Sequence, residues 1–143
     1  MELKRVVVTG IGALTPIGNT APKFWESLIN GVSGAAPITR FDASSFKTKF
    51  ACEVKNLTVE DFIDRKEMRR MDRYSHLGII AADEAIQNSK LLDSEPNKDR
   101  VGVIWGSGIG GIETFFEEAT NFALGDGSPR FNPFFIPKMI SDI

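Results

Sequence analysis

The sequence has almost none of the residues that build metal and redox sites. Among 143 residues it has one cysteine, Cys52, and one histidine, His76. A single cysteine cannot form an internal disulfide, and one cysteine with one histidine cannot make up a Cys/His metal cluster. We therefore expect neither a disulfide framework nor a bound metal.

Long apolar runs are also missing. The three valines at 6–8 are too short for the core of a signal peptide, and no later run approaches membrane-spanning length. The formal net charge of −2 argues against general affinity for nucleic acid. These absences predict a cytoplasmic protein that binds neither membrane nor nucleic acid. The ordinary composition, 42% hydrophobic and 25% charged, predicts a single domain with a sizeable core.

A glycine-rich stretch is the most informative part of the sequence. The apolar residues 101–105 run into Gly-Ser-Gly-Ile-Gly-Gly at 106–111, and an amphipathic segment follows at once. Apolar side chains at three-and-four spacing predict a helix over 112–124, which Gly125 and Gly127 end. The order strand, glycine loop, helix indicates that a ligand or another piece of backbone approaches this turn closely.

The same glycine loop satisfies a loose dinucleotide-binding pattern, G-x-G-x-x-G. That fingerprint also requires a second strand ending in an acidic residue about twenty positions on. Here a helix leads instead into Gly-Asp-Gly-Ser-Pro at 125–129. A structural turn, or the wall of a pocket for another ligand, is the favoured interpretation.

The remaining elements alternate between strands and helices. Residues 4–9 predict a buried strand, residues 22–31 a helix opened by proline and closed by glycine, and residues 50–54 a short strand. A short and then a long helix are expected between 58 and 88, the long one with a face of small residues. This alternation is typical of an α/β architecture with a largely parallel sheet.

A cluster of basic residues precedes the long helix. Lys66, Arg69, Arg70 and Arg73 fall at i, i+3, i+4 and i+7, so on one helix they would form a single positive stripe. The stripe could be a solvated face partly neutralised by neighbouring acids. The alternative is a docking patch for an acidic partner, because clustered charge speeds encounter and fixes orientation.

Two residues with reactive side chains, Cys52 and His76, and the apolar C-terminal segment remain to be interpreted. Cys52 lies in a predicted strand and is expected to be a small buried residue, while His76 has no partner that the sequence reveals. Composition alone yields no nucleophile, base and orienter set. The aromatic and aliphatic residues of 131–143 are expected either to lie against a partner or to belong to a chain that is cut short.

Taken together, five segments resemble the N-terminal part of bacterial β-ketoacyl-acyl carrier protein synthases of type II. The resemblance spans nearly the whole chain, in order, through residues 4–19, Arg-Phe-Asp at 40–42, the basic segment 65–72, the glycine loop 106–111 and Asn-Pro-Phe-Phe-Ile-Pro at 132–137.

The resemblance implies a thiolase-like layered α/β fold. Residues 1–143 would then be most of its N-terminal half, an N-terminal β-ketoacyl synthase domain that is incomplete at its C-terminal end. It further implies a homodimer that elongates fatty acids by decarboxylating Claisen condensation. Its partners would be the acyl carrier protein and acyl and malonyl thioesters, and no cofactor is implied.

The resemblance also assigns individual residues. Ile109 matches the pocket residue that gates acyl-chain length, and Phe134 matches an aromatic contributed near the dimer interface to the partner's acyl pocket. Lys66, Arg69 and Arg70 match basic residues presented to the acidic carrier protein, so docking becomes the favoured interpretation of the basic cluster.

No catalytic residue can be assigned within this chain. The family's nucleophilic cysteine and its two histidines follow the 132–137 motif, and neither Cys52 nor His76 matches them. The 143-residue chain alone is therefore expected to be inactive. The alternative is a non-catalytic condensing-enzyme homologue that acts as a chain-length or dimer partner subunit.

Overall fold

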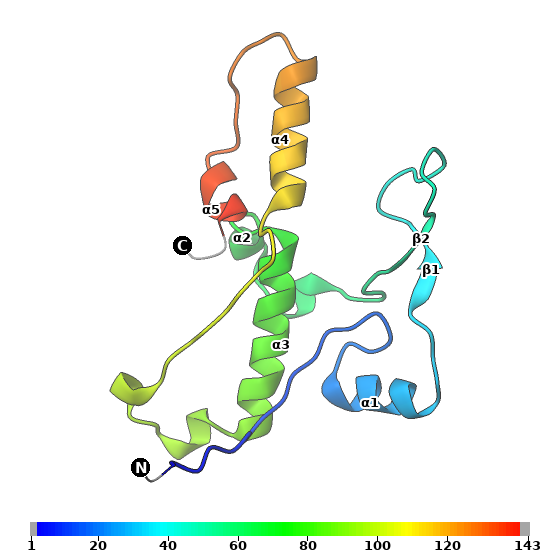
Figure 1. Cartoon of the computed structure of the whole chain (residues 1–143). Coiled ribbons are helices and arrows are strands. Elements are labelled where there is room, and N and C mark those ends of the chain that lie inside the picture. The colour runs from blue at the N-terminus through cyan, green and yellow to red at the C-terminus, as the bar shows by residue number, and fades with distance from the viewer. Residues whose placement is uncertain (1–2, 141–143) are drawn as a thin grey trace. The chain divides into compact units, whose positions relative to one another are not determined.

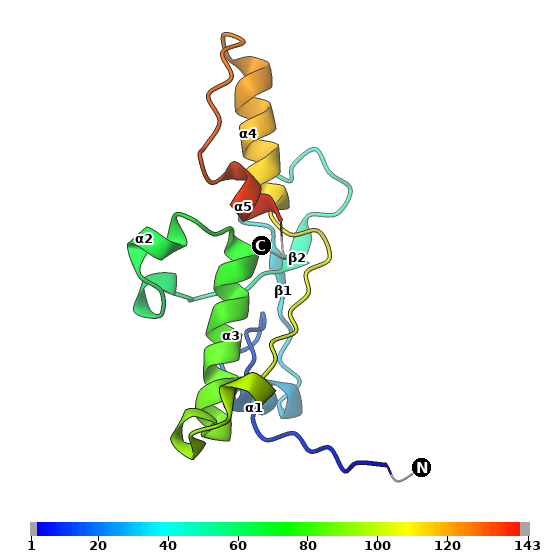
Figure 2. The same cartoon turned by 90° about the vertical axis from the view of Figure 1, so that its left-hand side faces the viewer.

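The computed structural model describes residues 3–140, in two compact units (Figures 1 and 2). The first unit extends to residue 57 and includes 80–96, and the second comprises 58–79 and the chain from 97 onward. The helices are α1 (Ala21–Ile29), α2 (Arg65–Met68), α3 (Arg73–Ser89), α4 (Ile112–Leu124) and α5 (Phe135–Met139), and the strands are β1 (Ala35–Pro37) and β2 (Phe50–Cys52). Short 3-10 turns lie at Val59–Asp61, Leu92–Ser94 and Lys98–Arg100.

In the first unit, α1 forms where proline and glycine predicted a helix. The Thr20 hydroxyl caps its start by accepting a hydrogen bond from the Lys23 N–H at 3.3 Å. Pro22 sits in the first turn, where its missing N–H costs nothing. After the helix, Gly31 takes a φ of +64°, a left-handed conformation that favours glycine.

The carboxylate of Glu84, on α3, fastens α1 and the preceding turn within the first unit. Its Oε1 accepts a hydrogen bond from the Ala21 N–H, and its Oε2 accepts one from the Ala13 N–H, each at 2.8 Å. The Ala21 N–H is one of the helix-start donors that have no partner inside the helix. A negative group at this end is also favoured by the helix dipole.

Two apolar segments predicted as strands are not strands in the described residues. Residues 4–9 and 101–105 are extended and unpaired, and the sheet found among residues 3–140 is the antiparallel β1–β2 pair. Val8 is 81% exposed and Ile104 is fully exposed. β-Branched sequence favours an extended backbone, but a strand also requires a neighbour for its ladder hydrogen bonds. The prediction of a parallel sheet is therefore wrong for this part of the chain.

Cys52 corrects a second expectation. It lies at the end of β2, opposite Ala35, and it is exposed rather than buried. β2 pairs with β1 over three residues only, and the two-stranded sheet buries neither Cys52 nor Phe50, which faces the same side. The expectation failed because a cysteine is buried only where something covers its strand.

In the second unit, α4 matches the predicted helix 112–124 at both ends and stops at Gly125. The aromatic segment that follows folds back onto it (Figures 1 and 2). The rings of Phe122 and Phe131 are 5.5 Å apart, those of Phe131 and Phe135 are 5.7 Å apart, and those of Phe115 and Phe135 are 6.3 Å apart. The segment 131–143 was expected to lie against a partner or to belong to a chain that is cut short; its rings Phe131 and Phe135 have neighbours within the chain, and residues 141–143 lie outside the described residues.

Two glycines allow close packing in the second unit. A Cβ on Gly78 would overlap the indole ring of Trp105, so the small-residue face of α3 does receive a neighbour. A Cβ on Gly111 would overlap the backbone of Lys138, and the Gly111 N–H donates to the Met139 carbonyl at 3.0 Å. The glycine loop therefore needs its last glycine because α5 passes against it.

A buried polar pair joins the start of α3 to α4. Asp72 is only 7% exposed, and Thr114 is only 8% exposed. Asp72 Oδ2 accepts hydrogen bonds from the Thr114 hydroxyl at 2.5 Å and from the Thr114 N–H at 3.2 Å. A buried carboxylate is tolerated when donors of this kind replace its lost water.

Replacing Thr114 with Val is expected to destabilise the protein by about 1.5–3 kcal/mol, because the buried Asp72 carboxylate loses one of its donors. Denaturant-induced unfolding of the intact protein measures the change. Thr120→Val is the matched control, since Thr120 lies on the same helix and its hydroxyl makes no hydrogen bond within residues 3–140. Equal stability of the two variants would show that the Asp72–Thr114 bond contributes nothing.

Candidate functional site

The basic segment, residues 65–73, is divided between two helices. Lys66 lies on α2, which ends at Met68, Arg69 caps that helix, and α3 begins at Arg73. The carbonyl of Asp72 accepts the first hydrogen bonds of α3, and its side chain accepts from the Arg73 N–H at 2.5 Å. Asp72 thus opens a new helix, as a residue preceding a first turn does. The prediction of one continuous helical stripe is wrong, although its first three cations remain together.

Lys66 and Arg69 are exposed and free of ion pairs. Both side chains reach solvent, and no carboxylate within residues 3–140 pairs with either of them. Unpaired surface cations keep their full charge available to an incoming anion, because no internal ion pair has to be broken first.

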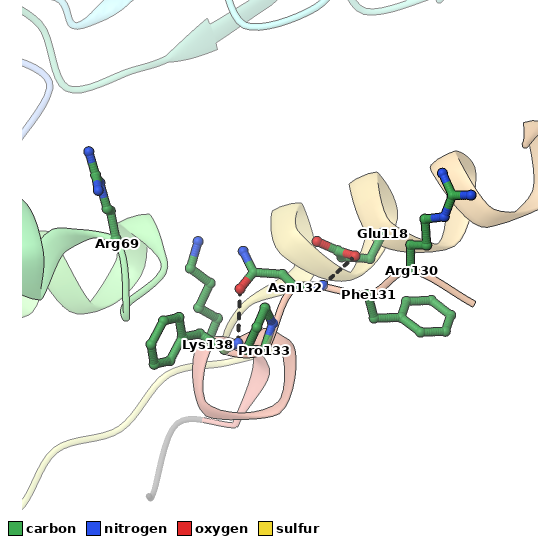
Figure 3. Close-up of a pocket in the computed structure, with 8 residues that line it drawn as sticks. Arg69, Glu118, Arg130, Phe131, Asn132, Pro133 and Lys138 are labelled. Atoms are coloured by element: carbon green, nitrogen blue, oxygen red, sulfur yellow. Dashed lines mark hydrogen bonds between the residues drawn. The ribbon is translucent and has the colours of Figure 1, made fainter. Parts of the chain in front are cut away.

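A hollow of about 540 Å³ opens beside Arg69 (Figure 3). Its lining combines three cations with aromatic and polar side chains: Arg69, Arg130, Lys138, Phe131, Phe134, Pro133, Asn132 and Glu118. Figure 3 shows the charged ends of Arg69, Arg130 and Lys138 directed to the same side. This basic hollow therefore offers positive charge next to apolar surface.

Hydrogen bonds around Asn132 shape the floor of the basic hollow. The Asn132 N–H donates to Glu118 Oε2 at 3.1 Å, and its side-chain oxygen accepts from the Phe134 N–H at 2.9 Å (Figure 3). Glu118, the one acid in the lining, is therefore occupied by a backbone donor. The cations remain the dominant charge of the hollow.

Arg130 differs from the other two cations because it has an acidic neighbour. Its guanidinium lies 3.7 Å from the carboxylate of Asp126, and both side chains are largely exposed. The Ser128 N–H donates to Asp126 at 2.9 Å and holds the pKa of that carboxyl below its ordinary value. Asp126 therefore stays charged, and Lys138 and Arg69 are the unpaired cations of the hollow.

Phe134 lies half-buried at the edge of the hollow, next to Arg70. The guanidinium carbon of Arg70 is 5.7 Å from the centre of the Phe134 ring, within the range of a cation–π contact. Arg70 also donates to Glu67 at 3.2 Å. The structure thus brings together two residues that the sequence assigned to different tasks.

Ile109 stands apart from this group. It lies in the glycine loop, its side chain is 75% exposed, and it does not line the basic hollow. Gly110, the next residue, has a φ of +77°, which turns the loop sharply before α4. The structure therefore presents Ile109 on an open loop without enclosing it.

No catalytic constellation is found among residues 3–140. His76 Nε2 lies 3.1 Å from the Met68 carbonyl, which gives the ring a structural hydrogen bond between α3 and α2. In the same range, no group of three His, Cys, Asp or Glu side chains is placed to hold a metal. Nor does any described helix have the length and apolar character needed to cross a membrane.

Two residues that line the basic hollow, Arg130 and Lys138, were not predicted from the sequence. Each is an isolated basic residue, 57 and 65 positions after Arg73, and no local spacing connects them with the basic segment. Only the return of the chain after α4 brings them near Arg69. A run of prolines and aromatics carrying single cations, at 129–138, is the one local signal that the sequence offers.

Comparisons with known proteins give a consistent result. The sequence profile of the β-ketoacyl synthase N-terminal domain matches residues 3–143. The chain is 47% identical over 143 residues to the 3-oxoacyl-[acyl-carrier-protein] synthase 2 of Synechocystis, a match that covers all of this chain and 34% of that protein. The chain thus spans about a third of the length of this curated relative.

Two solved structures have similar backbones. The ishigamide ketosynthase/chain length factor matches 94% of this chain and 33% of its own, with a TM-score of 0.68 and 26% identity. A type II polyketide ketosynthase in complex with its acyl-carrier protein matches 96% of this chain and 35% of its own, with a TM-score of 0.70 and 24% identity. The expected thiolase-like fold is thereby confirmed for this chain.

Proposed function

The chain belongs to the β-ketoacyl synthase family, and from that premise we propose that it is the N-terminal part of a 3-oxoacyl-acyl carrier protein synthase II. In the proposed reaction a cysteine takes the acyl group from its carrier thioester. Malonyl carrier protein then loses carbon dioxide, and the resulting carbanion attacks the enzyme-bound thioester. The 3-oxoacyl carrier protein leaves, and the enzyme thiol is restored. The 47% identity along the whole chain carries this proposal.

Residues 1–143 supply the N-terminal domain of that enzyme, and the domain is incomplete at its C-terminal end. The catalytic cysteine and both histidines lie outside these residues. Nucleophilic attack and stabilisation of the developing oxyanion both require groups that this chain does not hold. The chain by itself is therefore inactive.

The acyl chain is received by Ile109 and Phe134. Both side chains are apolar, and each methylene buried against such a wall contributes roughly 0.8 kcal/mol. The exposure of Ile109 on an open loop suits a residue whose partners come from elsewhere in the enzyme. Phe134 contributes to the acyl pocket of the other subunit of a homodimer.

Lys66, Arg69 and Arg70 dock the acyl carrier protein. The exposed, unpaired side chains of Lys66 and Arg69 support this assignment, and so does the basic hollow beside them. A partner with an acidic surface gains encounter rate and orientation from such a patch. A ketosynthase of similar fold has been solved in complex with its acyl-carrier protein. We place the enzyme in the cytoplasm, where carrier-bound intermediates would reach it.

A non-catalytic partner subunit is the second candidate. One protein of similar backbone is a ketosynthase/chain length factor, so the same fold occurs in an assembly that includes a chain-length factor. Such a subunit would keep the fold and the dimer surface without the nucleophilic cysteine.

A condensation assay tests the proposal. The intact enzyme, given acyl carrier protein loaded with a fatty acyl group and malonyl carrier protein, is expected to release carbon dioxide and form a 3-oxoacyl product. The chain 1–143 alone is the matched sample and is expected to release none above background. Intact protein that binds acyl carrier protein but releases no carbon dioxide would favour the non-catalytic candidate.

A further inference from the structure

The three cations assigned to carrier docking have different surroundings. Lys66 and Arg69 point into solvent without an ion pair among residues 3–140. Arg70 is held twice, by Glu67 at 3.2 Å and by the face of Phe134 at 5.7 Å. A cation already engaged on two sides is poorly placed to be the first contact of an incoming anion.

Glu67 sets the orientation of the Arg70 guanidinium. The two residues are three apart and their side chains meet across one turn, with Arg70 Nη1 on Glu67 Oε1. A guanidinium fixed from one side presents its planar face to whatever lies on the other side. Here that neighbour is the aromatic ring of Phe134.

Hydrogen bonds fix the backbone of Phe134 but do not involve its ring. Its N–H donates to the Asn132 side chain at 2.9 Å, and its carbonyl accepts from the Lys138 N–H at 2.9 Å. These bonds fix where the residue sits but leave the ring to be placed by its neighbours. Among residues 3–140 the Phe134 ring stacks with no other phenylalanine, and the guanidinium of Arg70 lies over its face.

We infer that Arg70 is a positioning residue for Phe134, which couples the basic segment to the acyl pocket. The inference rests on the proposed function, because Phe134 is assigned to that pocket there. Arg70 holds the ring in one orientation, and an acidic side chain of the carrier that draws Arg70 away releases it. Docking and the shape of the acyl pocket are then linked, and linkage acts equally in both directions.

Assays with acyl thioesters of a small thiol, which need no carrier protein, separate the positioning of Phe134 by Arg70 from carrier docking. The intact enzyme is assayed with a short and a long acyl thioester of a small thiol, so that carrier binding contributes nothing. Arg70→Gln is expected to change the long-to-short ratio of kcat/KM by about two- to fivefold, the scale of one cation–π contact. Arg70→Lys, which keeps the charge, is expected to recover part of that change. Arg65→Gln removes the same charge from the same basic segment without contacting Phe134, and is expected to leave the ratio unchanged.

A double-mutant cycle completes the test. If Arg70 acts through the ring, Arg70→Gln combined with Phe134→Leu changes the ratio no more than Phe134→Leu alone. Additive effects of the two substitutions, or a ratio for Arg70→Gln equal to that of Arg65→Gln, would overturn the inference. The same cycle applied to the free energy of unfolding gives a second readout, in which zero coupling between the two residues overturns it.

These outcomes are distinguishable from failure of the proposed function. Wild-type enzyme that turns over neither thioester would contradict the proposed reaction, and the unfolding cycle would still decide whether Arg70 and Phe134 are coupled. Coupling without any loss of carrier affinity in Lys66 and Arg69 variants would reject the docking assignment and with it the link to docking, while the positioning of Phe134 by Arg70 would stand.

Discussion

Replacing Ile109 with Phe in the intact enzyme is expected to lower kcat/KM for long acyl substrates by about ten- to a hundredfold, and to leave the shortest ones within about twofold. The larger ring shortens the space available to the end of the acyl chain, and overfilling an apolar site costs about 1–3 kcal/mol. Substrates that end before Ile109 avoid that cost. Competition between acyl carrier proteins of different chain length in one reaction measures the ratio directly.

Ile109→Val is the matched control for this prediction. It keeps the branched shape and removes one methylene, so long substrates should retain nearly all of their rate. Equal losses on short and long chains in Ile109→Phe would mean that the substitution distorts the glycine loop, and that Ile109 does not gate chain length.

Replacing Lys66 and Arg69 together with Gln is expected to raise the Kd for acyl carrier protein about tenfold at low ionic strength. Each exposed charge contributes about 0.2–1 kcal/mol to such a contact. Added salt screens the interaction, so the difference between wild type and variant should shrink as ionic strength rises. Most of the loss should fall on the association rate, because these cations steer encounter.

Lys47→Gln with Lys49→Gln provides the control for net charge. These two lysines are exposed and belong to the first unit, whereas the basic segment belongs to the second, and the pair removes the same total charge. Carrier affinity should be unchanged in this variant. A Kd that is unaltered in the Lys66 and Arg69 variant, or raised equally in both, would contradict the docking assignment.

Local sequence signals located most of the helices correctly. Apolar spacing and the terminating glycine gave α4 its bounds, and proline with Gly31 bracketed α1. These signals work because caps and amphipathic faces are decided within a few residues. The family resemblance was equally dependable, and the comparisons confirm it.

Features that depend on distant partners were not predictable in the same way. The segments 4–9 and 101–105 carry strand-forming residues, yet their backbones have no ladder partner within residues 3–140. Cys52 is exposed for the same reason, since β-propensity describes a surface that something else must cover. The hydrogen bond from Thr114 to Asp72 joins residues 42 positions apart and follows no local pattern.

In the candidate site, too, locally spaced residues were predictable and contacts between distant residues were not. Lys66 and Arg69 could be recognised from their spacing, whereas Lys138 and Arg130 join Arg69 in the basic hollow only through the turn after α4. The contact of Arg70 with Phe134 spans 64 positions and follows no local pattern. The family resemblance assigns each residue a task, and the structure shows that Arg70 and Phe134 lie in contact.

The central claim is that this chain belongs to a condensing enzyme that carries its acyl substrate on a cysteine. Denaturing mass spectrometry of the intact protein, incubated with acylated carrier protein, tests that claim most directly. The expected result is a mass increase equal to one acyl group on a cysteine, which disappears when malonyl carrier protein is added. An intact protein that docks the acylated carrier but gains no mass would contradict the account and identify a non-catalytic partner subunit.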